Sequence, residues 1–178
     1  MKNVVIISSS PRENGNSETL CKEFEKGAKE SGNKVELIKV RDYKLNYCVG
    51  CFACHTLGYC FQDDGINEIS KKLLSADVIV FATPVYFYSM SGQLKVLIDR
   101  LTPIYEKVKA DIYLIATMWD PDKQMMDSTF EAIRGLTRDC FEGCNEKGVL
   151  YGANLGEKNE ALNNKEYINQ AYLMGKNC

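Results

Sequence analysis

Short apolar runs alternate with amphipathic segments along the whole chain, and this alternation is the feature that most constrains the fold. Residues 4–7 are all β-branched and apolar, and residues 78–82 form the most apolar run in the sequence. Continuous apolar runs are typical of strands covered on both faces, because a strand with one solvated face alternates apolar and polar residues. Strands of this kind, separated by helices, are joined by βαβ crossovers. The sequence therefore predicts an α/β fold with a parallel sheet and helices on both faces.

The periodicity predicts five strands and five helices. The expected strands span residues 4–7, 34–40, 78–82, 112–116 and 149–153, and the charged residues among 34–40 indicate an edge strand. The first three helices are marked by Leu20, Phe24 and Ala28, by Ile66, Ile69 and Leu73, and by Leu94, Leu97, Ile98 and Leu101. The last two are expected around residues 128–144, with Cys140 and Cys144 on one helix face, and around residues 163–174. No repeat or linker interrupts the pattern, so residues 1–178 are expected to form a single domain.

Charge and hydropathy exclude several classes of partner. The formal net charge is −2 over 178 residues and no Lys- or Arg-rich run occurs, which argues against a nucleic acid or an anionic membrane as partner. No apolar run approaches the roughly 18 residues that span a bilayer, and the apolar start of the chain is too short for a signal-peptide core. We therefore expect a cytoplasmic protein that binds a small molecule.

The segment after the first strand has the composition of an anion-binding loop. Residues 8–17 read Ser-Ser-Ser-Pro-Arg-Glu-Asn-Gly-Asn-Ser and lead into the first helix. Backbone N–H groups and hydroxyls can converge there on an anion, because the amino end of a helix carries partial positive charge. The loop has neither the lysine of a Walker A motif nor the G-x-G-x-x-G spacing of a dinucleotide site. Taken alone, it fits both a phosphate site and a simple capped turn.

Two more loops are expected at the same edge of the sheet, where ligands of open parallel sheets bind. Residues 83–88 read Thr-Pro-Val-Tyr-Phe-Tyr, and three successive aromatic side chains in a loop cannot all point into a core. Thr117, Met118 and Trp119 end the fourth strand. The tryptophan is expected either to stack on a planar ligand or to cover the end of the sheet.

Four of the eight cysteines, Cys48, Cys51, Cys54 and Cys60, lie within thirteen residues. Such a cluster in a reducing compartment indicates metal binding or redox work. Zinc sites generally use two separated C-x2-C pairs, whereas successive x2 spacings are typical of the runs that hold [4Fe-4S] clusters. The spacing therefore favours [4Fe-4S] over zinc. A loop of reduced cysteines without metal is the alternative, and His55 is expected to be a bystander.

These segments together resemble one family. S-S-S-P-R-x-N-G-N-S-x-x-L resembles the G-S-P-R-x-x-G-N-[ST] loop of the flavodoxin-like NAD(P)H-dependent FMN reductases and iron-sulfur flavoproteins, with Ser9 in place of the family's glycine. Residues 84–95 resemble that family's P-[VI]-Y-[FW]-x-x-x-[ST]-x-x-L-K segment, and the match continues to Asp99 and Arg100. The cysteine spacing is similar to the compact motif of the iron-sulfur flavoproteins.

The resemblance implies a flavodoxin-like, doubly wound, five-stranded sheet of order 2-1-3-4-5. It implies FMN as cofactor, with the phosphate held by Ser9, Ser10, Arg12, Asn14, Asn16 and Ser17. Thr83, Pro84, Val85, Tyr86 and Phe87, with Thr117, Met118 and Trp119, would surround the flavin ring. It also implies a homodimer or homotetramer in which the cluster of one subunit lies near the flavin of another.

The function expected from these features is that of an FMN-dependent oxidoreductase. NAD(P)H, as a transient co-substrate, or a ferredoxin-type donor would reduce the flavin, which would pass electrons to a quinone-like or other small acceptor. No catalytic side chain is expected, because the chain has one histidine and its carboxylates are dispersed. The alternatives are a non-enzymatic FMN/[4Fe-4S] electron carrier and a zinc-binding or scaffold protein without flavin.

Overall fold

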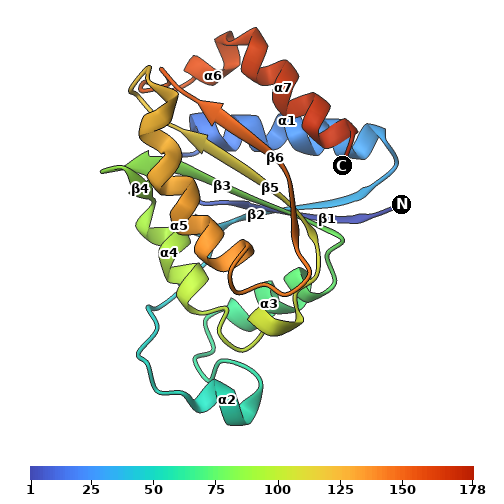
Figure 1. Cartoon of the computed structure of the whole chain (residues 1–178), viewed down its shortest axis with the longest axis vertical. Coiled ribbons are helices and arrows are strands. Elements are labelled where there is room, and N and C mark those ends of the chain that lie inside the picture. Colours follow the sequence, from blue (N-terminus) through green and yellow to red (C-terminus); the bar gives the residue numbers. More distant parts are fainter.

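The computed structural model describes residues 1–178 and is built around one twisted parallel sheet (Figure 1). Its five parallel strands are β1 (Asn3–Ser8), β2 (Lys34–Lys39), β3 (Val78–Tyr86), β5 (Asp111–Thr117) and β6 (Asn145–Gly152), in the order β2-β1-β3-β5-β6. This is the 2-1-3-4-5 order of a flavodoxin-like fold, and the charged strand lies at an edge as predicted. A short strand that was not predicted, β4 (Ser89–Met90), pairs antiparallel with the end of β3.

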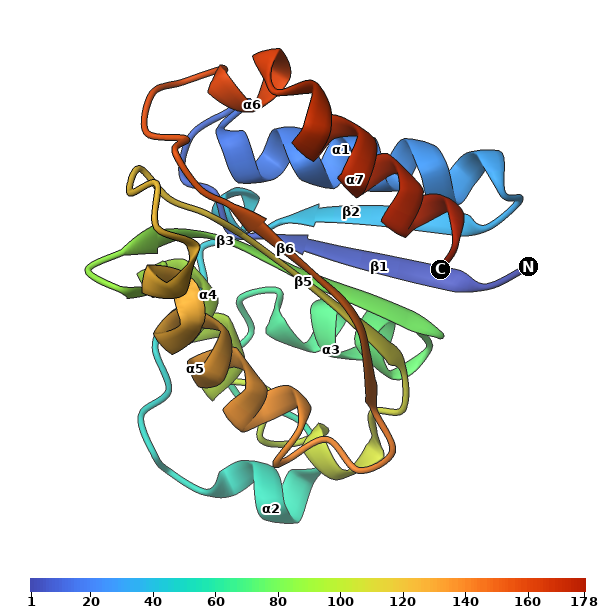
Figure 2. The same cartoon turned by 45° about the horizontal axis from the view of Figure 1, so that its top comes forward.

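Helices cover both faces of the sheet (Figure 2). One face carries α1 (Asn16–Glu30), α6 (Glu160–Asn163) and α7 (Lys165–Lys176), and the other carries α3 (Ile66–Leu74), α4 (Gly92–Asp99) and α5 (Asp127–Thr137). Single-turn helices lie at η1 (Val40–Asp42), η2 (Tyr105–Lys107) and η3 (Lys123–Met126). None of the helices has the length and apolar character needed to cross a membrane.

Alternate residues of the central strands enter two separate cores, because successive side chains of a strand point to opposite faces. Val5, Ile7 and Phe81 pack in a cluster of 27 buried residues with α3, α4 and α5. Val4 and Ile6 pack in a cluster of 16 with α1 and α7. The continuous apolar runs of the sequence therefore have the predicted cause, a sheet buried on both faces.

The C-terminal third differs from the prediction at one helix. The predicted helix 128–144 ends at Thr137, so Cys140 and Cys144 do not share a helix face. Cys144 instead lies directly before β6, and its sulfur accepts a hydrogen bond from the N–H of Ala110, which directly precedes β5. The final predicted helix is present as α7, which begins where the Asn164 side chain accepts from the Tyr167 N–H. The short helix α6, directly before Asn164, was not predicted.

The cysteine-rich stretch leaves the body of the molecule after η1 and returns at α3. It contains one short helix that was not predicted, α2 (Ala53–Leu57), which projects from the far end of the molecule (Figure 1). Phe52 and Gly58, the residues on either side of α2, both have left-handed backbone conformations that turn the chain sharply.

Candidate functional site

The three predicted loops meet in one cavity at the carboxyl ends of the strands. The cavity has a volume of about 230 Å³. It is lined by Ser10, Arg12, Gly15, Asn16 and Ser17 after β1, by Pro84, Val85 and Tyr86 at the end of β3, by Thr117, Met118 and Trp119 after β5, and by Leu155 and Gly156 after β6. The site therefore lies where the alternation of strands and helices predicted it.

One end of the cavity is the amino end of α1. The N–H groups of Asn16, Ser17 and Glu18 donate to no group of the protein, as is usual for the first turn of a helix. The Ser17 hydroxyl beside them is buried and also has no hydrogen-bond partner. These unpaired groups form a site with the chemistry of an anion receptor.

The absence of a side chain at Gly15 leaves space at the amino end of α1. Gly15 directly precedes α1, and a Cβ there would collide with the Ser10 hydroxyl oxygen. That hydroxyl closes the turn, since it donates to the Arg12 carbonyl and accepts from the Arg12 N–H. Arg12 itself is exposed and lines the cavity.

Asn16 lines the cavity, but its side-chain amide is already fully engaged. It donates to the carbonyls of Leu155 and Glu157 and accepts from the Ala161 N–H. The side chain therefore joins α1 to the segment after β6 and has no free donor for a phosphate. Only its backbone N–H is available.

Two predicted phosphate-binding residues lie outside the cavity lining. Ser9 is buried behind it, donating to the Ala82 carbonyl and accepting from the Ser91 hydroxyl. Asn14 has a left-handed backbone, and its side chain accepts from Lys22. Both residues shape the loop, and neither side chain reaches the cavity.

An ion pair that sequence reasoning missed supports the loop from behind. Arg41, in η1 after the edge strand, donates to the carbonyls of Ser10 and Arg12 and to the buried carboxylate of Glu18. Burial alone would raise the pKa of the Glu18 carboxyl, but the hydrogen bond and charge of Arg41, aided by Lys22, hold that pKa below its ordinary value. The carboxylate is therefore ionised, and it anchors the arginine that orients the loop.

Aromatic side chains line the part of the cavity away from α1. Tyr86 and Trp119 are 41% and 75% exposed and lie at its rim. A Cβ at Gly156 would collide with the Trp119 ring, so this glycine lets the tryptophan lie against the loop after β6. Leu155 and Gly156 were not predicted as site residues, although the rule that ligands bind at carboxyl ends applies equally to the loop after the fifth parallel strand.

Two more residues predicted for the ring site lie outside the lining. Thr83 is buried, where its hydroxyl accepts from the Ser91 N–H and donates to the Pro84 carbonyl. Phe87, at the tip of the β3–β4 hairpin, is 99% exposed and does not reach the cavity. The expectation that the three successive aromatics do not all point inward is confirmed, since Tyr86, Phe87 and Tyr88 are all exposed.

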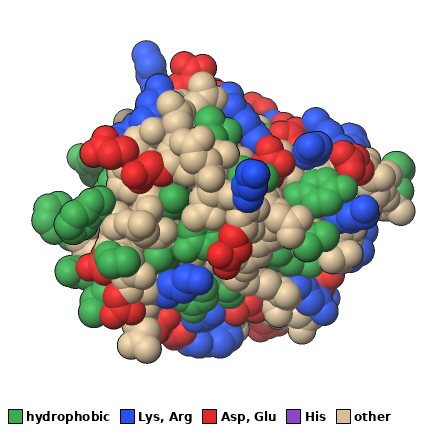
Figure 3. Space-filling model, turned by 90° about the horizontal axis from the view of Figure 1, so that it is seen from above, with side chains coloured by type: hydrophobic (Ala, Val, Ile, Leu, Met, Phe, Trp, Pro, Cys, Tyr) green, Lys and Arg blue, Asp and Glu red, His purple; other side chains and the backbone are tan.

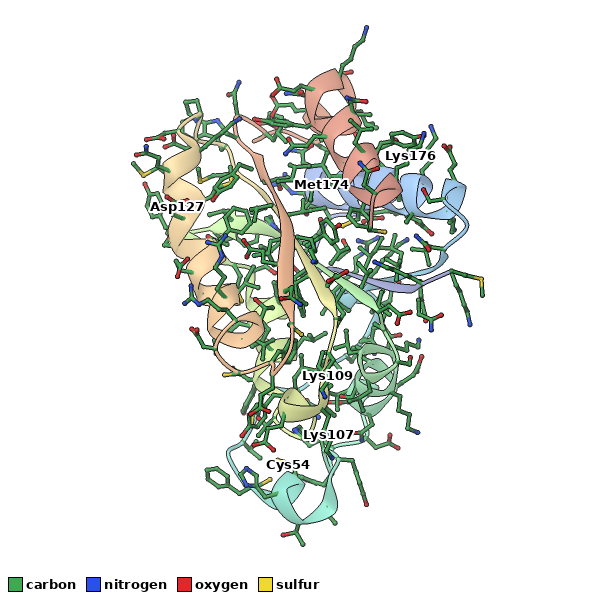
Figure 4. All side chains as sticks on the ribbon, turned by 45° about the vertical axis from the view of Figure 1, so that its right-hand side comes forward. Cys54, Lys107, Lys109, Asp127, Met174 and Lys176 are labelled. Carbon is green, nitrogen blue, oxygen red and sulfur yellow. The ribbon has the colours of Figure 1, made fainter.

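The four clustered cysteines line a second, much smaller cavity at the far end of α4. Cys48 and Cys51 are exposed, Cys54 and Cys60 are partly buried, and all four are free thiols. The other walls include the apolar residues Val49, Phe52, Phe61 and Pro103. No three Cys, His, Asp or Glu side chains are gathered as ligands of one metal ion. Figure 4 shows Cys54 on the projecting helix, well away from α7.

A buried arginine binds this loop to the body of the molecule. The side chain of Arg100, at the end of α4, is 1% exposed and pairs with both carboxylate oxygens of Asp64. Its Nε donates to the Cys60 sulfur at 3.2 Å. Burial raises the pKa of the Asp64 carboxyl, but Arg100 and the Asn46 N–H more than offset this and lower it overall.

A doubly wound sheet with an anion receptor and an aromatic wall at its carboxyl edge defines the class of nucleotide-binding α/β proteins to which the flavodoxin-like flavoproteins belong. The family model for NADPH-dependent FMN reductases matches residues 2–117. The chain belongs to this family.

Curated relatives carry the name iron-sulfur flavoprotein. One from Methanocaldococcus jannaschii is 43% identical over 101 residues, which are 57% of this chain and 52% of the relative. One from Methanosarcina thermophila is 36% identical over 94 residues, which are 53% of this chain and 49% of the relative. The chain thus matches about half the length of these relatives.

Solved structures share the fold at low sequence identity. An NAD(P)H:quinone oxidoreductase from Methanothermobacter marburgensis superposes with a TM-score of 0.78 at 13% identity, covering 99% of this chain and 96% of that one. An FMN-dependent NADH-azoreductase from Bacillus anthracis, solved in complex with FMN, has a TM-score of 0.67 at 14% identity, covering 99% and 97%. At this identity the likeness establishes the fold alone.

Proposed function

We propose that the chain is an FMN-dependent oxidoreductase. It would take electrons from NAD(P)H or a ferredoxin-type donor and deliver them to a quinone-like or other small acceptor. The observation that carries the proposal is the buried, unpartnered hydroxyl of Ser17 at the amino end of α1, in a cavity whose opposite wall is aromatic. An unpaired buried hydroxyl costs free energy, and a phosphate oxygen would satisfy it.

The residues present fit FMN. The N–H groups of the first turn of α1, the Ser17 hydroxyl and the Arg12 guanidinium would bind the phosphate, while Arg41 keeps their loop in shape. Pro84, Val85 and Tyr86 on one side, with Thr117, Met118 and Trp119 on the other, would flank the ring. Bound FMN would supply the conversion between transfer of an electron pair and transfer of single electrons.

The protein would contribute binding and orientation rather than proton transfer. The single histidine, His55, lies on the projecting loop against Phe52, with ring centroids 5.4 Å apart, and does not line the flavin cavity. The exposed rim at Tyr86 and Trp119 leaves a ring face open, so a nicotinamide would stack there transiently as co-substrate. This arrangement favours ping-pong kinetics, in which donor and acceptor use the same face in turn.

The cysteine cavity supports a [4Fe-4S] cluster on Cys48, Cys51, Cys54 and Cys60. All four cysteines line one largely apolar cavity, and their donor set is that of a four-iron centre. Thiolates at the corners of such a cluster stand further apart than the ligands of one ion, so the lack of a single-ion site does not oppose this. The cavity is about 30 Å³, so the exposed part of the loop would widen to admit the cluster. In the reducing cytoplasm these thiols would stay unpaired.

The distance between the two cavities supports a homodimer or homotetramer as the working form. Helix α4 begins beside the flavin cavity, where its cap residue Ser91 bonds Ser9, and ends beside the cysteines at Arg100. Its eight residues alone span about 12 Å.

Exposed apolar side chains lie at both sites, including Phe52 and Phe61 on the cysteine loop and Phe87 and Trp119 near the flavin cavity. Figure 3 shows hydrophobic side chains gathered at the edge of the molecule on the side where β3 ends. Burying these surfaces between subunits would bring a cluster close to a partner's flavin.

The decisive experiment is purification without oxygen, followed by a visible spectrum and assays of iron, sulfide and zinc on the same sample. Flavin bands that bleach with NADH or NADPH are expected, together with iron and sulfide. A colourless protein would contradict the flavin assignment, and zinc in place of iron would favour the metal-binding or scaffold alternative. If flavin and iron are present but no pyridine nucleotide bleaches the flavin, the non-enzymatic carrier is the better description.

A further inference from the structure

The end of α4 contains the largest fully buried side chain of the molecule, Arg100, and every hydrogen bond of its guanidinium goes to the segment that carries the cysteines. Besides the paired bonds to Asp64, it donates to the carbonyls of Asn46 and Gln62 and to the sulfur of Cys60. A charged group is costly to bury, so full burial persists only where partners satisfy it.

Cys60 differs from the other three clustered cysteines in how firmly it is placed. The Asn67 side chain of α3 accepts from the Cys60 N–H at 3.0 Å and donates to the Cys60 carbonyl at 2.7 Å. The Arg100 Nε then directs its proton at the sulfur. No side chain donates to the sulfurs of Cys48, Cys51 or Cys54, and the first two are exposed. Hydrogen bonds therefore hold both the backbone and the sulfur of Cys60 in place. The other three cysteines lie on the projecting stretch and have no such bonds to their sulfurs.

We propose that Arg100 is a positioning residue for the iron-sulfur centre, which fixes Cys60 as the first ligand and raises the reduction potential of the cluster through its N–H···S bond. The proposal rests on the proposed [4Fe-4S] site and extends it to a group outside the ligand set. Hydrogen bonds to cluster sulfurs and nearby charge are the protein's main means of setting the potential. A reduced cluster carries one more negative charge than an oxidised one, so a buried cation that donates to a ligand sulfur stabilises the reduced form.

The test compares Arg100→Lys with Asp64→Asn in the full chain, purified and reconstituted without oxygen. Lysine keeps the positive charge, but its single ammonium group cannot donate hydrogen bonds to Asp64, to the two carbonyls and to the Cys60 sulfur at the same time. Asp64→Asn weakens the ion pair but leaves the Nε–H···S bond in place. The exposed Arg138→Lys is the matched arginine control. The measurements are iron and sulfide per chain, iron loss to a chelator, the cluster midpoint potential by EPR-monitored titration, and thermal unfolding of the metal-free forms.

Arg100→Lys is expected to lower the midpoint potential and to lose iron at about 10- to 100-fold less chelator than the wild type. Asp64→Asn is expected to lower the unfolding temperature without lowering the potential, and Arg138→Lys to match the wild type. The proposal is overturned if Arg100→Lys matches the wild type in potential, or if Asp64→Asn lowers the potential equally, since that would show only a loosened loop. A wild type that takes up flavin but no iron would instead overturn the proposed cluster, and this proposal with it.

Discussion

At the scale of single residues, Ser17 and Asn16 have opposite roles although they are neighbours in one motif. Both line the flavin cavity at the start of α1. The Ser17 hydroxyl has no partner, whereas the Asn16 amide makes three hydrogen bonds to the segment after β6. The first group is available to a ligand, and the second stabilises the fold.

Ser17→Ala is therefore expected to weaken FMN binding by about 10- to 100-fold, because a hydrogen bond to a charged phosphate contributes about 1.5–3 kcal/mol. The flavin-free protein should unfold at the same temperature as the wild type or slightly higher, since an unsatisfied buried hydroxyl is removed. Flavin titration followed by fluorescence, with thermal unfolding of the flavin-free form, measures both effects.

Asn16→Ala is the matched comparison. It should cost the flavin-free protein about 1–3 kcal/mol, because it leaves buried backbone groups of the segment after β6 without partners. Unchanged flavin affinity in Ser17→Ala would place the phosphate elsewhere.

The different roles of Ser17 and Asn16 cannot be predicted from the sequence. The Ser/Asn/Gly-rich composition of residues 8–17 fits both an anion-binding loop and a simple capped turn, and the aromatic loop after the central strand favours the first. It could not separate Ser17 from Asn16, because the partners of Asn16 lie about 140 residues further along the chain. Arg41 carries no signal in the sequence and Arg100 only extends the family resemblance, so the support that their guanidinium groups give to the two ligand loops is seen only in the folded chain.

At the scale of elements, α1 and α7 approach so closely that each needs a glycine. A Cβ at Gly27 would collide with the Tyr172 carbonyl, and one at Gly175 would collide with the Phe24 carbonyl. Gly27→Ala is expected to lower the free energy of unfolding by about 1–3 kcal/mol, since two backbones would have to separate. Gly135→Ala, on α5 with open space around it, should raise that energy by about 0.5–1 kcal/mol. Urea unfolding of both variants measures these energies, and equal effects would contradict the close approach.

The β3–β4 hairpin is strained at its tip. Phe87 and Tyr88 have φ values of 50° and 58°, a conformation that favours asparagine and glycine in two-residue turns. Replacing both with Asn-Gly should stabilise the fold by about 1–2 kcal/mol, measured by urea unfolding. Backbone strain of this kind is found at functional sites, so we expect the same variant to slow the proposed reduction of a quinone by NAD(P)H. Unchanged turnover would show that these exposed aromatics do not contact acceptor or partner.

Elements with a strong period were the predictable ones. The apolar runs at residues 4–7 and 78–82 located the central strands, because a strand that is buried on both faces has a continuous apolar sequence. The hairpin strand β4 and the helix α2 are too short to show a period. The helix predicted to residue 144 ends at Thr137, and Cys144 lies directly before β6, where its sulfur accepts from the Ala110 N–H directly before β5.

At the scale of the whole molecule, two ion pairs on different elements connect the ligand loops to the body of the fold. Glu18 with Arg41 supports the flavin loop, and Asp64 with Arg100 supports the cysteine loop. Burial alone would raise the pKa of the Glu18 and Asp64 carboxyls, but the paired arginine brings the pKa of each below its ordinary value. Both ligand loops therefore depend on carboxylates that stay ionised.

This dependence predicts how stability changes with pH. A carboxyl whose pKa is lower in the folded than in the unfolded chain contributes stability that is fully present above the unfolded value, about 3.9 for Asp and 4.3 for Glu. That stability is lost as pH falls through the folded value, when the unfolded chain binds more protons.

Asp64→Asn should therefore be less stable than the wild type at about pH 7, and the difference should shrink below about pH 4. The exposed neighbour Asp63→Asn should follow the wild type throughout. Urea unfolding across this range measures the difference, and a gap between Asp64→Asn and the wild type that stays constant with pH would show that the Asp64 carboxylate stabilises the fold through packing rather than charge.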